Sequence, residues 1–287
     1  QFSKNNEIIF LTGDLGFMAL EELRDSLGDR FINCGVSEQN MIGVAAGLAK
    51  QGFSVFVYSI APFVYARPFE QIRNNIMFNQ LPVCLIGNGG GFAYGSMGPT
   101  HHALEDCSVM SSLGLEIKVP VFDNDLVSII QSIKLPTYLR LGQQVVPKDK
   151  KIPKFKPWRR LIKGNKTIII SFGPLAGLLW KVINDFPLKL RPTLWAASDF
   201  NFSNIPNEFV EEINGKHIVV FEEHVKNGGF GMHISHFILE KCIKIIQFKH
   251  FAVDGYPKET FGSQRYHREL NKIDETHIKA FIYEQQK

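Results

Sequence analysis

The feature that most constrains the fold is a repeated alternation of short, mainly apolar runs with longer helical stretches. Runs of this kind without polar alternation are typical of strands buried on both faces of a parallel sheet. Strands that alternate with helices favour such a sheet, covered by helices on both sides. The sequence therefore predicts an α/β fold. The expected strands are residues 8–11, 30–34, 54–58, 83–87, 116–120, 137–141, 167–173, 193–197, 217–224 and 245–251.

The alternation lapses once, where Pro, Lys and Trp occur without any periodicity. Such a stretch is typical of a connection between domains. We therefore predict a first domain over residues 1–145, a linker over 146–164, and a second, smaller α/β domain over 165–287. Each domain is expected to hold a mostly parallel sheet with helices on both faces.

Composition excludes several classes of protein. Of the 287 residues, 45% are hydrophobic and 21% charged, with a net charge of +4, which is typical of a soluble globular protein. No apolar stretch is long enough to span a membrane, and the lysines of 148–151 form too short a run for a nucleic-acid groove. Four scattered cysteines without a CxxC pair favour reduced thiols and a cytoplasmic location.

The first candidate site is the segment 35–40, Gly-Val-Ser-Glu-Gln-Asn, followed by small apolar residues through Ala49. Ser37 is expected to cap the helix with its hydroxyl. Glu38 then lies in the first turn, where a carboxylate complements the helix dipole. Because this helix has almost no polar face, we expect it to be buried on nearly all sides. A carboxylate leading into it needs a partner or a chemical role.

Other candidates lie in loops, where the carboxyl ends of parallel strands bind ligands. The aromatic-rich residues 60–65 are expected to form a loop leading into a helix over 67–78. The glycine-rich segments 88–95 and 228–231 match no phosphate-binding pattern and are expected to be tight turns. In Gly98-Pro-Thr-His-His102, ligand spacing does not favour metal. A hydrogen-bonding or proton-shuttling histidine and a surface pair without a role both stay open.

In their order along the chain, these motifs resemble one family. Residues 221–224 with 228–231 resemble the transketolase C-terminal domain. The resemblance covers nearly the whole chain. It implies the pyrimidine-binding fold of thiamine-diphosphate enzymes, then a transketolase C-terminal domain, and transfer of a two-carbon ketol unit between sugars. The motifs that resemble the transketolase pyrimidine-binding domain are residues 14–16, 35–40, 67–73, 98–101 and 138–142.

The family's Gly-Asp-Gly…Asn magnesium motif has no match here, and the length leaves no room for that domain. The resemblance therefore implies that Mg²⁺ and the diphosphate of thiamine diphosphate are held mainly by a separate N-terminal subunit. It also implies self-dimerisation within an α2β2 heterotetramer and a small-molecule sugar substrate, with no role for nucleic acid or membrane.

The resemblance also implies individual roles. Glu38 would hydrogen-bond N1′ of the aminopyrimidine and favour the imino tautomer that deprotonates the thiazolium. For this Glu38 has to hold a proton, which apolar surroundings favour and a helix N-terminus opposes; we expect burial in a closed subunit interface to dominate. Phe63 would stack on the aminopyrimidine, with Tyr65 as the alternative. The other implied contacts are Asp14, Ile60 and Arg67 with the cofactor, and His101 with the donor's hydroxyls.

Three departures from the family pattern bear on the substrate. Met97 stands where an Asp is common, and His102 stands where a Gln is usual; both are candidates for substrate contact. Gly142-Gln143 replaces a segment that often holds a phosphate-binding Arg, a residue suited to that anion. The sequence thus leaves open whether the donor is phosphorylated or nucleotide-linked, which acceptor it uses, and the oligomeric state.

Two other functions stay open on the sequence alone. One is the beta subunit of a 2-oxo acid dehydrogenase, which shares both domains; residues 98–101 and 140–142 look more like transketolase. The other is a non-catalytic assembly subunit, against which the intact Glu38 argues.

Overall fold

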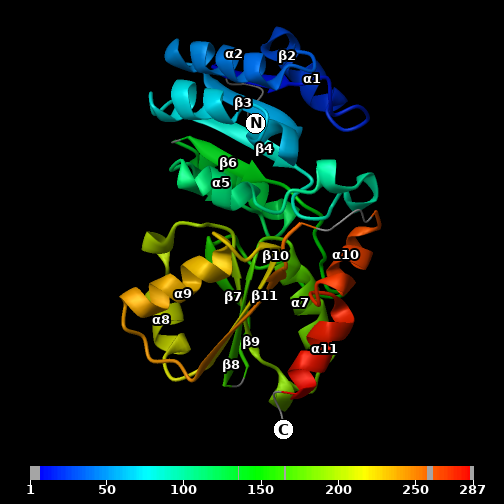
Figure 1. Ribbon diagram of the computed structural model, residues 1–287, viewed down its shortest axis with the longest axis vertical. Helices are drawn as coiled ribbons and strands as arrows, with labels where there is room; N and C mark the ends of the chain where they lie inside the picture. The colour runs from blue at the N-terminus through cyan, green and yellow to red at the C-terminus, as the bar shows by residue number, and fades with distance from the viewer. Residues whose placement is uncertain (1–6, 135, 165, 257–260, 285–287) are drawn as a thin grey trace.

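In the computed structural model, which describes residues 7–134, 136–164, 166–256 and 261–284, the chain forms two sheets arranged one below the other (Figure 1). The first has six strands in the order β2-β1-β3-β4-β6-β5, all parallel. Its strands are β1 (Ile8–Thr12), β2 (Phe31–Asn33), β3 (Ser54–Ile60), β4 (Val83–Asn88), β5 (Glu116–Lys118) and β6 (Thr137–Arg140).

Helices cover both faces of this first sheet. Side chains of α2, α3, η3 and α5 pack on one face, and those of α1 and α6 on the other. The helices are α1 (Glu21–Leu27), α2 (Glu38–Lys50), α3 (Ala61–Tyr65), α4 (Phe69–Gln71), the π-helix η3 (Ile72–Met77), α5 (Asp106–Ser112) and α6 (Leu126–Ser132), with 3-10 turns η2 (Gly28–Arg30), η4 (Gly95–Met97), η5 (Pro99–His101) and η6 (Asp123–Asp125).

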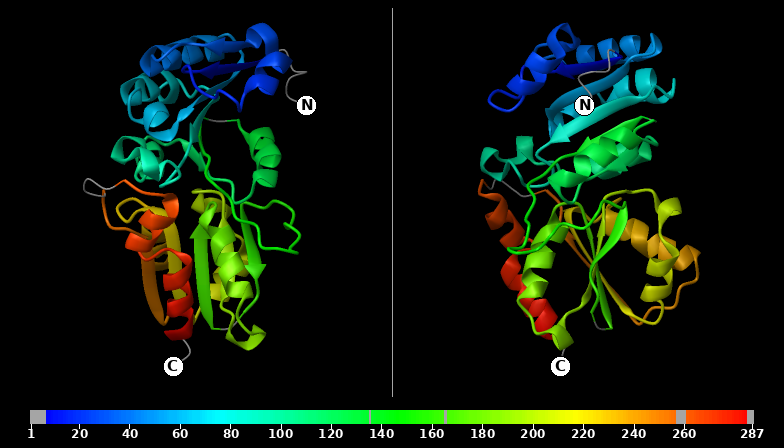
Figure 2. Two further views of the ribbon diagram at one scale, coloured as in Figure 1. Left: turned by 90° about the vertical axis from the view of Figure 1, so that its right-hand side faces the viewer. Right: turned by 180° about the vertical axis from the view of Figure 1, so that it is seen from behind.

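The second sheet has the order β11-β10-β8-β9-β7, and all its pairs are parallel except β7 with β9. Helices α8 and α9 cover one face, α7 and α11 the other (Figures 1 and 2). The predicted α/β class with mostly parallel sheets is confirmed. The elements are β7 (Trp158–Ile162), β8 (Thr167–Phe172), α7 (Leu175–Asn184), η7 (Leu188–Leu190), β9 (Thr193–Ala197), η8 (Phe202–Asn204), α8 (Asn207–Ile213), β10 (His217–Val225), α9 (Phe230–Glu240), β11 (Gln247–Val253), α10 (Gln264–Leu270) and α11 (Glu275–Glu284).

Strand β7 lies inside the segment 146–164, where we expected a linker without regular structure. Its arginines explain why it escaped detection. The Arg159 guanidinium makes a two-pronged ion pair with Asp125 of η6 (2.9 and 2.5 Å), and both side chains are buried. Arg160 pairs with Glu208 and Glu212 of α8. The basic strand therefore extends the second sheet and ties it to the first half of the chain; the domain limits themselves stay a prediction.

Two further local expectations were wrong. Residues 61–65 form the short helix α3 rather than a loop, because Pro62 sits at a first-turn position where its missing N–H costs nothing. The helix expected over 67–78 is a short α-turn followed by the π-helix η3. Wider π-turns are rare and often occur at functional sites.

No helix in the part of the chain that the structure describes is long and apolar enough to cross a membrane. None of the four cysteines forms a disulfide.

Candidate active site

Glu38 opens helix α2 and is 4% exposed. The preceding Ser37 is the N-cap residue, but its hydroxyl donates to the Cys34 carbonyl (2.8 Å) and caps no amide. The expected capping bond is therefore absent, and a tight turn aims the helix end instead. Gly13 adds to this arrangement, because a Cβ there would lie 4.0 Å from Glu38 Oε1.

Helix α2 is not buried on nearly all sides, as its composition led us to expect. One side packs into the core of the first sheet through Met41, Ile42 and Ala45. On the other side, Gly43 and Gly47 are exposed and have no atom within 4 Å of an ideal Cβ. The small apolar residues thus leave one face of the helix uncovered within this chain.

Arg67 connects Glu38 to the aromatic segment. Its Nη1 lies 2.8 Å from Glu38 Oε1, and its guanidinium carbon lies 3.8 Å from the centroid of the Phe63 ring. A cation this close to a ring face is attracted by the ring's electrons. The Arg67 side chain is 44% exposed, so the pair joins a buried carboxylate to a cation at the surface.

Phe63 in turn contacts His101, with ring centroids 5.1 Å apart in an edge-to-face arrangement. Thr100 Oγ1 lies 2.9 Å from His101 Nδ1, and the Tyr94 ring lies 6.4 Å away. Glu38, Phe63 and His101 follow β2, β3 and β4 respectively, so the site lies at the carboxyl edge of the sheet, as expected for parallel strands. The structure brings these three residues and Arg67 together; their chemical roles stay predictions.

Asp14 occupies a supporting position. Its carboxylate accepts a hydrogen bond from the Asn33 side chain (2.9 Å), and Asn33 Oδ1 accepts from the backbone amides of Asp14 and Gly35 (2.9 Å each). Asn33 thereby fixes the two loops that flank Glu38. Sequence reasoning missed Asn33, although its place at the end of a predicted strand was a usable signal.

The other predicted cofactor contacts differ in position. Tyr65 is 3% exposed and its hydroxyl donates to Glu105; burial raises the pKa of this phenol. Its ring therefore belongs to the core, which leaves Phe63 as the aromatic side chain at the site. Ile60 is half-buried at the end of β3.

The two candidate substrate contacts also differ. Met97 is 53% exposed in η4. His102 is fully buried, with its ring edge-to-face against Phe92 (5.1 Å) and His267 (4.8 Å). Burial lowers the pKa of both histidines. The expected contact between His102 and substrate does not fit this position, because the ring packs between two elements of the core.

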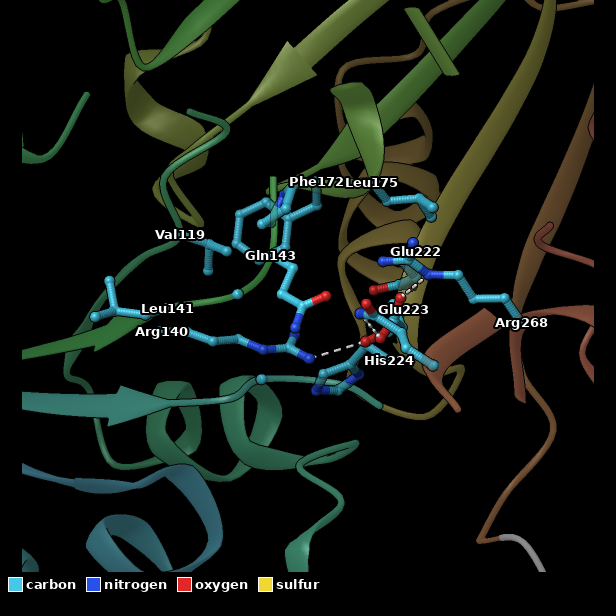
Figure 3. Close-up of a pocket in the computed structure, with 14 residues that line it drawn as sticks. Val119, Arg140, Leu141, Gln143, Phe172, Leu175, Glu222, Glu223, His224 and Arg268 are labelled. Atoms are coloured by element: carbon cyan, nitrogen blue, oxygen red, sulfur yellow. Dashed lines mark hydrogen bonds and ion pairs between the residues drawn. The ribbon is translucent and has the colours of Figure 1, made fainter. Parts of the chain in front are cut away.

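A second polar cluster lies between the two sheets and includes Arg140, at the end of β6 (Figure 3). The guanidinium is 7% exposed. Its Nη2 donates to the carbonyls of Ala103 (3.0 Å) and Glu223 (2.9 Å), and its Nε lies 3.3 Å from Asp106 Oδ2. A Cβ on Gly90 would lie 2.0 Å from this Nε, so a glycine is required beside the guanidinium.

The carboxylate of Glu223 completes this contact between the sheets. It accepts from the backbone amide of Phe92 (2.6 Å) and from the side chains of Gln264 (2.9 Å) and Arg268 of α10. Next to it lies a cavity of about 30 Å³, with room for about one water molecule. The motif 221–224, noticed only through the family resemblance, therefore joins the two halves of the chain.

Ligand atoms of Asp106, Cys107 and His224 lie within 4.8 Å of one another, close enough to suggest a metal site. However, Arg140 contacts both Asp106 (3.3 Å) and the Cys107 sulfur (3.7 Å). Burial raises the pKa of the Cys107 thiol well above its usual value. The guanidinium already supplies the positive charge, so this cluster is an ion-paired core group.

Comparison with known proteins agrees with this geometry. The transketolase pyrimidine-binding domain matches residues 2–148. The chain belongs to the transketolase family. It is 31% identical over 242 residues to a subunit of the apulose-4-phosphate transketolase of Phocaeicola vulgatus, and the match covers 79% of this chain and 76% of that protein.

Two further transketolase relatives support the same family. A putative transketolase C-terminal section of Methanocaldococcus jannaschii is 32% identical over 146 residues, 49% of this chain and 46% of that protein. A solved structure of a split-gene transketolase, described as an inactive beta4 tetramer, is 25% identical with a TM-score of 0.79, over 99% of this chain and 93% of that one. The predicted thiamine-diphosphate-dependent, transketolase-like C-terminal subunit is thus confirmed at family level, and the two alternatives are not favoured.

Proposed function

We propose that this chain is the pyrimidine-binding subunit of a split transketolase and that Glu38 is its essential acid. The observation that carries the proposal is the buried Glu38 carboxylate, at the carboxyl edge of the sheet and one residue, Arg67, away from the Phe63 ring face. Two of the features that an aminopyrimidine needs, an edge partner and a stacking face, therefore adjoin each other.

These residues fit thiamine diphosphate, because a planar cation already occupies both features. The cofactor, when bound, supplies the nucleophilic thiazolium carbon that carries the two-carbon unit. Glu38 would hold a proton against the ring nitrogen, and Phe63 would stack on the ring. His101, beside Phe63, would hydrogen-bond a donor hydroxyl. Ile60 would add apolar surface to the ring's surroundings.

We infer that a separate subunit carries the Mg²⁺ and diphosphate ligands and that the two assemble as α2β2. The absence of a Gly-Asp-Gly…Asn motif from this sequence supports the first point. The uncovered face of α2, with Gly43 and Gly47 exposed, supports an interface with another chain. The solved relative is named as an inactive tetramer of beta chains, which supports self-association. The unpaired cysteines support a cytoplasmic location.

We further propose that the segment after β6 makes no phosphate contact with the donor sugar. Gln143 lines the cavity between the sheets (Figure 3), and Gln144 bonds Asp123. Both side chains are thus engaged within the fold. Equal transfer rates from phosphorylated and unphosphorylated ketoses would support this point, and a strict need for the phosphate would contradict it.

The central test is Glu38→Gln in the enzyme assembled with its partner subunit. Loss of a positioned proton donor lowers turnover by about 10²- to 10⁴-fold, so glycolaldehyde transfer should fall by that much while the melting temperature and assembly stay close to wild type. Near-normal turnover would remove Glu38 from the mechanism. Transfer to a lipoyl carrier in the same assay would instead indicate a 2-oxo acid dehydrogenase.

A further inference from the structure

The guanidinium of Arg67 rests on the same two groups that the proposed function assigns to the aminopyrimidine. One is the Glu38 carboxylate, 2.8 Å from Nη1, and the other is the Phe63 ring, 3.8 Å from the guanidinium carbon. Within the described residues, Glu38 is its only ion-pair partner. Arg67 therefore lies where we had expected the cofactor, rather than beside it.

Guanidinium and aminopyrimidine present similar surfaces. Both are planar, both place N–H donors at an edge, and both stack on aromatic rings. A site that binds one plane through a carboxylate and a ring face is suited to the other. The Arg67 side chain is also 44% exposed, and a long side chain at a surface swings into water while its stem stays in place.

We propose that Arg67 is an internal substitute for the aminopyrimidine, which the cofactor displaces when it binds. This inference rests on the proposed function. In the free chain, Arg67 keeps the buried Glu38 ionised and paired, since a buried carboxylate without a partner is strongly unfavourable. When the ring arrives, the guanidinium leaves for solvent and Glu38 takes up the proton that it shares with the ring nitrogen.

The neighbouring loops carry two other titratable groups. The Asp14 carboxylate accepts from Asn33, and the His101 ring contacts Phe63 and Thr100. Neither makes an ion pair with Glu38 within the described residues. The proton taken up on binding is therefore expected at Glu38.

Calorimetry of thiamine diphosphate and Mg²⁺ binding to the assembled enzyme tests the proposal without measuring turnover. Titrations at mildly alkaline pH in two buffers of different protonation enthalpy give the number of protons bound. We expect uptake of about one proton per site in the wild type and none in Glu38→Gln. Wild-type binding without proton uptake would overturn the proposal. If the wild type does not bind thiamine diphosphate, the proposed function itself fails.

Arg67→Met separates displacement from support. If Arg67 competes with the cofactor, this variant should bind thiamine diphosphate several-fold more tightly and take up fewer protons, because its Glu38 is already neutral. Weaker binding would mean that Arg67 holds the cofactor and would contradict the proposal. Arg24→Met, which removes an exposed arginine 3.2 Å from Asp25, is the matched control and should bind as the wild type does.

A stability measurement on the full chain guards against misfolding of Arg67→Met. This variant should melt several degrees lower, and adding Glu38→Gln should recover most of that loss because no buried charge remains. Arg67→Lys keeps the charge without the planar fork and should retain proton uptake. Additive effects of Arg67→Met and Glu38→Gln would show that the ion pair is not coupled and would overturn the proposal.

Discussion

At the scale of single residues, the choice between Phe63 and Tyr65 as the stacking residue depends on direction rather than chemistry. The two stand two positions apart in α3, so they point to different sides of the helix. Tyr65 turns to Glu105 in the core, whereas Phe63 turns to Arg67 and His101. Sequence reasoning named both residues but expected a loop, in which neither direction is fixed.

We expect Phe63→Ala to weaken thiamine diphosphate binding in the assembled enzyme by about tenfold, because a stacked aromatic pair contributes roughly 0.5–1.5 kcal/mol beyond its buried area. Equilibrium titration measures the change. Tyr65→Phe is the control: it removes the hydroxyl bonded to Glu105 and should lower thermal stability while leaving cofactor affinity unchanged. The opposite result would assign stacking to Tyr65.

At the scale of elements, the apolar strands β1, β4, β8 and β9 were predictable because both of their faces are buried. Strand β7 was not, since its arginines look like a solvated linker until Asp125, Glu208 and Glu212 are brought beside them. The same limit applies to the site. Glu38 and His101 were identified by local motifs, whereas the contact of Arg67 with both Glu38 and Phe63 depends on the turn of α3 into α4.

Arg159→Met should lower the free energy of unfolding by about 3 kcal/mol or more, because removing one partner of a buried ion pair strands the other. Here Asp125 would stay buried between η6 and β7 with two backbone donors but no cation. Urea unfolding gives the value. Lys181→Met, at an exposed pair with Glu275, should cost less than about 1 kcal/mol; equal losses in both variants would contradict this account.

At the scale of the whole molecule, contacts between segments far apart in the sequence hold the two sheets together. Glu223 bonds the Phe92 amide 131 positions away, and α10 reaches back to the first half through His267, which stacks on Phe92 at 4.6 Å. No local pattern encodes such pairs, which explains why the sequence predicted two domains but not how they join.

The buried histidines make this junction sensitive to acid. Burial lowers the pKa of His102 and His267, and the Glu223 carboxylate only partly opposes this. Below about pH 6.5 the unfolded chain therefore binds more protons than the folded one, and stability should fall as pH decreases. Melting curves between neutral and mildly acidic pH should show this decline, and His267→Phe should reduce it. A decline of equal size in that variant would exclude His267 as a cause.

The interlocking of charges between the sheets has a practical consequence for anyone who wants the cofactor-binding half by itself. Cutting the chain after β6 would leave Arg140 without the Glu223 carbonyl, Asp125 without Arg159, and the Phe92 amide without an acceptor. Such a fragment would expose a polar surface shaped for a neighbour that is gone. Its expression would call for redesign of that surface before any choice of end point.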